Sequence, residues 1–169
     1  MGDAGNMQGA ALAMQGASSF ASSYSQSQAM ESQGIFNAQL AETNARLARL
    51  QAEDAIARGE KEAANHKNRV GQMVGSQRAA MAAQGISVDS GSAAQIQAET
   101  YAIGDEDART IRTNAWREAW GYQTQAINYQ SQGQFDRMAS RNQARNTLLT
   151  GGMQAASYGA QSYAAFKKN

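Results

Sequence analysis

The sequence predicts an all-α protein built on a long antiparallel helical hairpin. The 169 residues contain no proline, the residue that most strongly interrupts a helix. Only 7% of the residues are aromatic, and much of the hydrophobic fraction is alanine, which removes little apolar area from water. A single cluster of Gly, Ile, Ser, Val and Asp at residues 85–91 separates two long helical patterns. These observations favour two extended helices whose burial comes largely from neighbouring copies, assembled into a ring or tube.

The first helix of the hairpin is expected over residues 30–84. Its larger apolar residues recur at steps of three and four, as one face of a helix requires. Glu42 with Arg46, and Asp54 with Arg58, add pairs at i,i+4 with the acid first, which is the better orientation. The apolar face comprises Ile35, Phe36, Leu40, Leu47, Leu50, Ile56, Val70, Met73, Val74 and Met81.

The second helix is expected over residues 93–149, after a tip at residues 86–91. Gly85 suits the left-handed position that follows a helix C-terminus. Ser92 and Gln95 form a capping-box pattern, with Ser92 as the N-cap. The apolar positions of this helix are Ile96, Ile103, Ile111, Trp116, Trp120, Ile127, Phe135, Met138 and Leu148. The tip, a candidate docking surface, comprises Gly85, Ile86, Ser87, Val88, Asp89, Ser90, Gly91 and Ser92.

A tip centred near residue 88 makes the numbers of facing residues sum to about 176. Both charge and hydrophobicity fit this register, and such agreement is informative. The expected pairs are Arg78 with Glu99, Arg69 with Asp107, Arg58 with Glu118, Glu31 with Arg145, Met73 with Ile103, and Ile56 with Trp120.

The two ends of the chain carry almost no charge, which divides it into three segments. Residues 1–30 and 150–169 are rich in small residues and flank the hairpin at 31–149. Small residues at steps of four form a ridge along which helices can approach closely, as they do in membranes. Three interpretations of these ends are open: they line a ring inserted in a membrane, they pack as alanine-rich helices in a protein assembly, or they are partly ordered low-complexity tails. The ridge comprises Gly9, Ala13, Ala17, Ala21, Gly152, Ala156, Ala160 and Ala164.

Arg137, Arg141 and Arg145 form a basic stripe that stops where the second charge-free stretch begins. Such a stripe suits lipid phosphates or a nucleic-acid backbone, and the alternative is a solvated face or one that forms ion pairs between subunits. Trp116 and Trp120, with Tyr122 and Tyr129 nearby, suit either an interfacial belt or a core between helices or subunits.

Several classes of function are not indicated by the sequence. The net charge is +1, there is no cysteine, and the N-terminus has neither the basic nor the apolar region of a secretory signal. No run of 18 strongly apolar residues suggests an ordinary transmembrane helix. His66 and Glu62 lack further ligands for a metal, and the carboxylates at 105–107 have cations within reach, Arg109 for Asp105 and Arg69 for Asp107. Without a phosphate loop or a nucleophile–base set, we expect no enzyme, metal or cofactor.

Four stretches resemble the small internal virion proteins of short-tailed phages of the autographivirus type. They are LAETNARLARLQAEDAIARGEKE (40–62), VGSQRAAMAAQGISVDSGSAAQI (74–96), RTIRTNAWREAWGYQTQAINYQSQGQ (109–134) and TLLTGG (147–152). The resemblance spans about residues 35–155. The tip and the Trp-Arg-Glu-Ala-Trp-Gly-Tyr run contribute most of its specificity.

The resemblance implies a structural role inside the virion. Such proteins belong to the core mounted on the portal, with larger ejection proteins as partners. On infection they leave through the tail and build a conduit for double-stranded DNA across the host envelope, the smallest being associated with the outer membrane. The alternatives are a scaffold or portal spacer that never contacts lipid, and a tail or portal adaptor that touches DNA through the arginine stripe.

Overall fold

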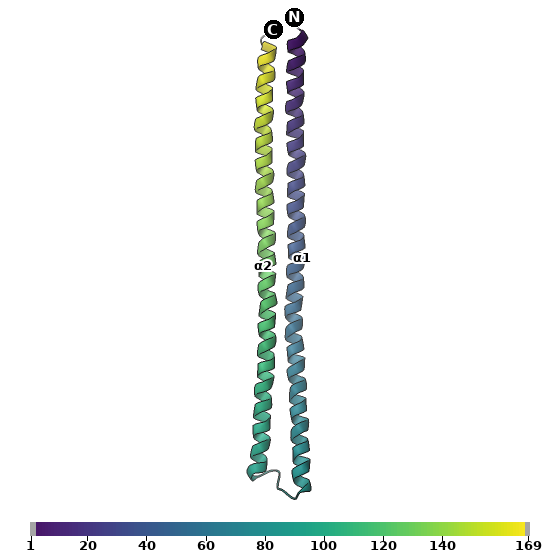
Figure 1. Ribbon diagram of the computed structural model, residues 1–169, viewed down its shortest axis with the longest axis vertical. Coiled ribbons are helices and arrows are strands. Elements are labelled where there is room, and N and C mark those ends of the chain that lie inside the picture. Colours follow the sequence, from purple (N-terminus) through teal and green to yellow (C-terminus); the bar gives the residue numbers. More distant parts are fainter. Residues whose placement is uncertain (1–2, 168–169) are drawn as a thin grey trace. The chain divides into compact units, whose positions relative to one another are not determined.

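The computed structural model describes residues 3–167 and confirms the all-α class. Two helices, α1 (Asp3–Ala83) and α2 (Gly91–Lys167), pack against each other and are joined by residues 84–90 (Figure 1). No strand occurs between residues 3 and 167. The charge-free ends are helical over residues 3–30 and 150–167, because α1 and α2 run without a break through residues 30 and 149.

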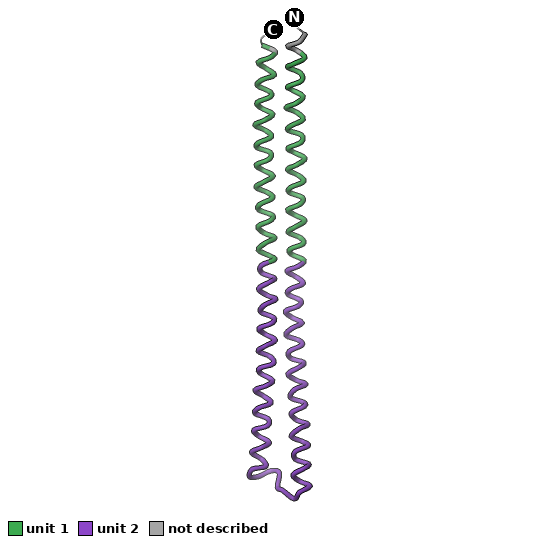
Figure 2. Tube along the Cα trace, viewed as in Figure 1, with its two compact units in different colours: residues 1–43, 129–169 green, residues 44–128 purple. Residues whose placement is uncertain are grey.

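The contacts divide the chain into two compact units, each made of one stretch of α1 and one of α2. Unit 1 comprises residues 1–43 and 129–169, and unit 2 comprises residues 44–128 (Figure 2). Unit 2 contains the connection between the helices. It also holds ten of the 15 basic and ten of the 14 acidic residues, so it is neutral overall.

The seam of unit 2, where its two helical stretches meet, consists mainly of alanine. Ala52, Ala55 and Ala119 form a buried cluster, with Ile56 and Tyr122 packed at its edge. One seam position per turn gives ten steps over the 36 residues from Ala45 to Met81, and the half-buried Ile56 and Gly71 lie directly beside this row. The row comprises Ala45, Ala48, Ala52, Ala55, Gly59, Ala63, His66, Val70, Val74, Gln77 and Met81. This stride of 3.6 residues equals the natural repeat of the α-helix, whereas a left-handed coiled coil needs 3.5. The seam of unit 2 therefore follows the helix surface without requiring supercoiling.

Glycines bring the two backbones of each unit close together. In unit 2, a Cβ added to Gly59 would overlap the Cβ of Ala115, and one added to Gly104 would lie 2.6 Å from a methyl group of Val70. Unit 1 repeats this arrangement at four further glycines. They are Gly16 against Tyr158, Gly34 against Ser140, Gly133 against Ala41, and Gly151 against Ser23.

The register differs by one residue from the predicted tip centre. Every glycine pair of the seam, in either unit, has numbers that sum to 174, as in Gly59 with Ala115. The predicted sum was 176. The connection spans residues 84–90, so its centre falls at residue 87 and not at 88.

The larger apolar residues mostly lie outside the seam, which corrects the prediction that they form one interhelical face. Val70 and Val74 are buried, but Leu47, Leu50 and Met73 are exposed. The predicted facing pairs Met73–Ile103 and Ile56–Trp120 are also wrong, because Ile103 and Trp120 are exposed. Small residues at the seam let the backbones approach closely, and this leaves no room there for large side chains.

The end of α1 is fixed by a Schellman motif. The amide of Gly85 donates to the carbonyl of Ala82 at 3.0 Å, and the amide of Ile86 donates to the carbonyl of Met81 at 3.1 Å. Gly85 has a φ of 75°, the left-handed conformation this motif requires. The placement of Gly85 after the helix end is therefore confirmed.

The start of α2 differs from the prediction. The helix begins at Gly91, so Gly91 and Ser92, which were assigned to the tip, belong to its first turn. Among the described residues, Ser92 and Gln95 share no side-chain hydrogen bond, so the capping box is not formed. The side-chain amide of Gln95 instead donates to Glu99 at 3.1 Å. Gly91 has a φ of 63°, and this left-handed residue lets the chain enter the helix before Ser92.

Candidate assembly surfaces

Unit 2 exposes a row of large apolar side chains on α2. Trp116, Trp120 and Ile127 lie at steps of four and seven, on one side of the helix. They are 57%, 70% and 61% exposed, respectively. Of the alternatives for the two tryptophans, a core within the hairpin is therefore excluded, whereas an interfacial belt and a core between subunits stay predictions. Three large apolar residues on one side of a helix form the kind of surface that a partner covers.

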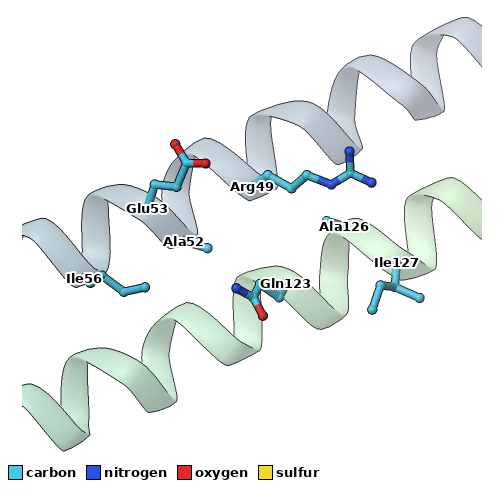
Figure 3. A pocket seen from close by; sticks show the side chains of 7 residues that line it. All are labelled: Arg49, Ala52, Glu53, Ile56, Gln123, Ala126 and Ile127. Carbon is cyan, nitrogen blue, oxygen red and sulfur yellow. The ribbon is translucent and has the colours of Figure 1, made fainter.

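A groove runs beside this row, between α1 and α2 of unit 2 (Figure 3). Ala52 and Ala126, two buried alanines of the seam, contribute to its lining. Polar and charged residues line it together with two isoleucines. The complete lining is Arg49, Ala52, Glu53, Ile56, Gln123, Ala126 and Ile127.

Ion pairs connect the two helices of unit 2 at its surface. Arg58 contacts Glu118 across the seam and Asp54 along α1, both at 2.9 Å. The predicted pairs of Arg58 with Glu118 and with Asp54 are thus confirmed. Arg112 donates to Glu60 at 2.9 Å, a pair the sequence did not indicate. All these groups are substantially exposed, so each pair adds little stability.

The carboxylates at 105–107 are partly paired across the seam. Asp105 lies 2.7 Å from the Lys67 ammonium. This hydrogen bond, with the positive charge of Lys67, holds the pKa of Asp105 below its usual value of 3.8. Asp107 lies 3.4 Å from Nε2 of His66, although the two atoms are not aligned for a hydrogen bond. Lys67 thus forms the direct ion pair with Asp105, while the predicted partner Arg109 adds a smaller electrostatic contribution that also lowers the pKa of Asp105. For Asp107, His66 lies in the place of the predicted partner Arg69.

The connection between the helices is tied down by two side chains. Arg78 contacts Asp89 at 2.7 Å, in place of its predicted partner Glu99. Gln97 donates to the carbonyl of Val88 at 2.9 Å and to that of Ala93 at 3.1 Å. The hydroxyls of Ser87 and Ser90 are hydrogen-bonded at 3.0 Å. The tip is therefore an ordered surface, on which Ile86 is exposed.

Unit 1 places two residues of the predicted arginine stripe beside α1. Arg137 and Arg141 line a groove with Glu31 and Ile35 of α1. Within residues 3–167, no carboxylate lies within ion-pair distance of Arg137, Arg141 or Arg145. The predicted pair of Glu31 with Arg145 is thus not formed. The sequence revealed the stripe but not its α1 neighbours, whose identification needs the register.

The predicted ridge of small residues mostly does not form the seam. Gly9 is buried and Gly152 is half-buried, but the alanines of the ridge are exposed in this chain: Ala13, Ala17, Ala21, Ala156, Ala160 and Ala164. A ridge at steps of four drifts around the helix because one turn takes 3.6 residues, so the ridge leaves the side that faces the other helix. The exposed alanines are free to contact other chains. That role in assembly stays a prediction.

Two kinds of feature are absent from the helices that the structure describes. Neither α1 nor α2, over residues 3–167, contains a stretch that is both long and apolar enough to cross a membrane. Over the same residues, no three His, Asp or Glu side chains are grouped so that they could hold a metal ion.

The fold defines a class: an antiparallel two-helix protein with a small-residue seam and large apolar residues on its outer surface. Comparisons with protein-family models, curated proteins and solved structures gave no match to this chain.

Proposed function

We propose that the protein is a structural component of a phage virion. In this proposal it belongs to an internal core on the portal, leaves the capsid during infection, and helps to form a channel for DNA across the host envelope. Its partners are further copies of itself, larger ejection proteins, the portal and the passing DNA, which it contacts without sequence specificity. It acts by assembly and not by catalysis.

The observation on which the proposal rests is the outward position of the large apolar residues. Trp116, Trp120 and Ile127 are exposed while the seam beside them is closed by alanine. An apolar row of this size is costly to leave in water and is a common feature of subunit contacts. This supports a chain that completes its burial by packing against others.

Two further properties support passage through a narrow tail. The chain has no cysteine and hence no disulfide, and between residues 3 and 167 its buried hydrophobic residues are mainly alanines, so no large core would have to be dismantled during passage. Its seam buries mainly methyl groups, whose transfer from water contributes little free energy per residue. The resemblance of residues 35–155 to internal virion proteins of short-tailed phages agrees with this use.

The assembly step is tested by sedimentation velocity of the full chain over a range of concentrations. We expect a defined oligomer, together with a blue shift of tryptophan emission as Trp116 and Trp120 become covered. Replacing both with glutamine should weaken the oligomer. A matched variant, Met73→Gln with Ile103→Gln, removes two exposed apolar residues of the same unit and should have a smaller effect. A monomeric wild-type chain at all concentrations would contradict the proposal.

The channel step is tested by dye release from vesicles of anionic phospholipid. Release of small but not large dyes by the full chain would support a channel. A second candidate, an intracapsid scaffold or portal adaptor that never contacts lipid, is favoured by the lack of a membrane-spanning stretch in residues 3–167. A helical, oligomeric chain that releases no dye would favour that candidate.

A further inference from the structure

Over the described residues, the three arginines of unit 1 lack the carboxylate partners that several arginines of unit 2 have. In unit 2, Arg58, Arg78 and Arg112 contact carboxylates at 2.7–2.9 Å. Arg137, Arg141 and Arg145 have no such partner among residues 3–167. They span eight residues of α2, or about 12 Å. Three exposed cations on one helical face attract an anionic surface.

The surroundings of these arginines are apolar as well as cationic. Arg137 and Arg141 share a groove with Ile35 and Glu31 of α1. On α1, Tyr24 lies on the same face as these two residues, at steps of seven and eleven, and is exposed. On α2, the half-buried Leu148 follows Arg145 by three residues. The face therefore combines guanidinium groups with aromatic and aliphatic side chains.

Beyond this groove the same unit has no charge for a long distance. Residues 4–30 of α1 and 146–166 of α2 contain no Asp, Glu, Lys or Arg. The structure pairs these two segments, with Gly16 against Tyr158 and Gly151 against Ser23. The arginines are thus concentrated at one end of an uncharged two-helix segment.

We propose that this face of unit 1, which we call the arginine face, binds the surface of an anionic phospholipid membrane. The arginine face comprises Arg137, Arg141, Arg145, Tyr24, Ile35 and Leu148. The guanidinium groups contact lipid phosphates, while the tyrosine and aliphatic side chains enter the boundary between headgroups and acyl chains. The inference rests on the proposed function, because it names the surface with which the protein meets the envelope.

The mode of binding is peripheral and requires no membrane-spanning helix. A paired helical segment can lie in the interface plane with one face toward the acyl chains. This fits the finding that neither helix, within residues 3–167, is apolar enough to cross a membrane. Serine and glutamine, which are frequent in the uncharged segments, remain in contact with water in this orientation.

Duplex DNA fits the arginine face less well. DNA presents one phosphate charge per ~1.7 Å of its axis, so a stable contact needs cations along an extended track. No cation occurs in the 21 residues that follow Arg145, and the carboxylate of Glu31 lies in the groove beside Arg137 and Arg141, where it repels a phosphate backbone. Leu148 and Tyr24 would gain no burial against a phosphate backbone. A lipid surface uses both the charged and the apolar side chains.

The test is co-sedimentation of the full-length protein with vesicles of phosphatidylcholine, with and without phosphatidylglycerol. We expect binding only to the anionic vesicles, weakened by added salt. The triple variant R137Q/R141Q/R145Q should lower the partition coefficient about 100-fold at low salt. Lysine at the same three positions should retain binding to within a few-fold, because the charge is kept.

A matched control removes the same charge from unit 2. Arg69, Arg109 and Arg117 are exposed and, in the described part of the chain, form no ion pair. R69Q/R109Q/R117Q should therefore bind anionic vesicles nearly as well as the wild type. Circular dichroism of each variant confirms that the helices are intact.

Four outcomes would overturn the inference. The first is that the control variant loses as much vesicle binding as the arginine-face variant, and the second is that the protein binds neutral vesicles as well as anionic ones. The third is that inorganic phosphate displaces the protein from vesicles more than chloride does at equal ionic strength. The fourth is that the protein binds duplex DNA through these arginines but does not bind vesicles. Dye release separates this inference from the proposed function. Equal release by the wild type and the glutamine triple variant would refute the role of the arginine face alone. Arginine-dependent binding without release would refute the channel alone.

Discussion

A methyl group added at Gly59 should separate the two helices of unit 2. The Cβ of Gly59→Ala would overlap the Cβ of Ala115, which belongs to the seam of α2. Alanine is favoured over glycine within a helix by about 1 kcal/mol, which acts in the opposite direction. Overpacking of a closed seam costs typically about 1–3 kcal/mol. The net expectation is a loss of stability of up to about 2 kcal/mol.

The same substitution at an open position supplies the control. Gly75 lies on the same helix and unit, and a Cβ added there meets no atom within 4 Å. Gly75→Ala should therefore stabilise the protein by about 1 kcal/mol, the full helix-propensity gain. Both variants gain the same helix propensity. The difference between their free energies of unfolding, about 1–3 kcal/mol, therefore measures the cost of overpacking at Gly59 alone.

Exchanging the two residues tests the contact itself. The double variant Gly59→Ala with Ala115→Gly keeps one methyl group and one glycine in the pair. It should recover most of the stability lost by Gly59→Ala, and such non-additivity is the signature of direct contact. Urea unfolding followed by circular dichroism gives the free energies. If Gly59→Ala stabilised the chain as much as Gly75→Ala, the reasoning about the seam would be refuted.

Three further predictions concern the connection and the surface of unit 2. Gly85→Ala should cost about 1–2 kcal/mol in urea unfolding because its φ is 75°, and an unchanged midpoint would contradict the Schellman motif. Gln97→Leu should cost about 1–2 kcal/mol by removing the donor to the Val88 carbonyl, and it should speed amide exchange in residues 84–90. Lys67→Met should return the pKa of Asp105 toward 3.8 in an NMR titration. In the wild type this pair stabilises the folded chain above that pH, and its contribution is lost as the pH falls through the lowered pKa.

The hairpin could be predicted because its signals are local. The absence of proline, Gly85 at the end of α1, and the facing charges of Arg58 and Glu118 each act over short distances or through a simple register. Those signals gave the correct helix class and one cross-seam ion pair. They placed the tip centre only one residue away from its observed position.

The packing face could not be predicted by searching for large apolar residues. Periodicity arguments weight leucine, isoleucine and tryptophan most heavily, yet Ala52, Ala55 and Ala119 close the seam of unit 2. Because alanine is frequent throughout the chain, the alanines that lie in the seam at a spacing of 3.6 residues can be recognised only when their burial is known. The groove beside Arg137 likewise depends on the register, because its neighbours Glu31 and Ile35 lie on the other helix.

The small residues of the seam, alanine and glycine, affect how precisely the register between the two helices is specified. Side chains of one size offer few features by which one helix can recognise its proper position along the other. In unit 2, Gly104 beneath Val70 is one of the few places where unequal residues interlock. The short connection at 84–90, held by Arg78 and Gln97, therefore fixes which residues of α1 and α2 face each other. With the connection cut, the two halves would be expected to slide past one another by whole helical turns and settle in several alternative pairings.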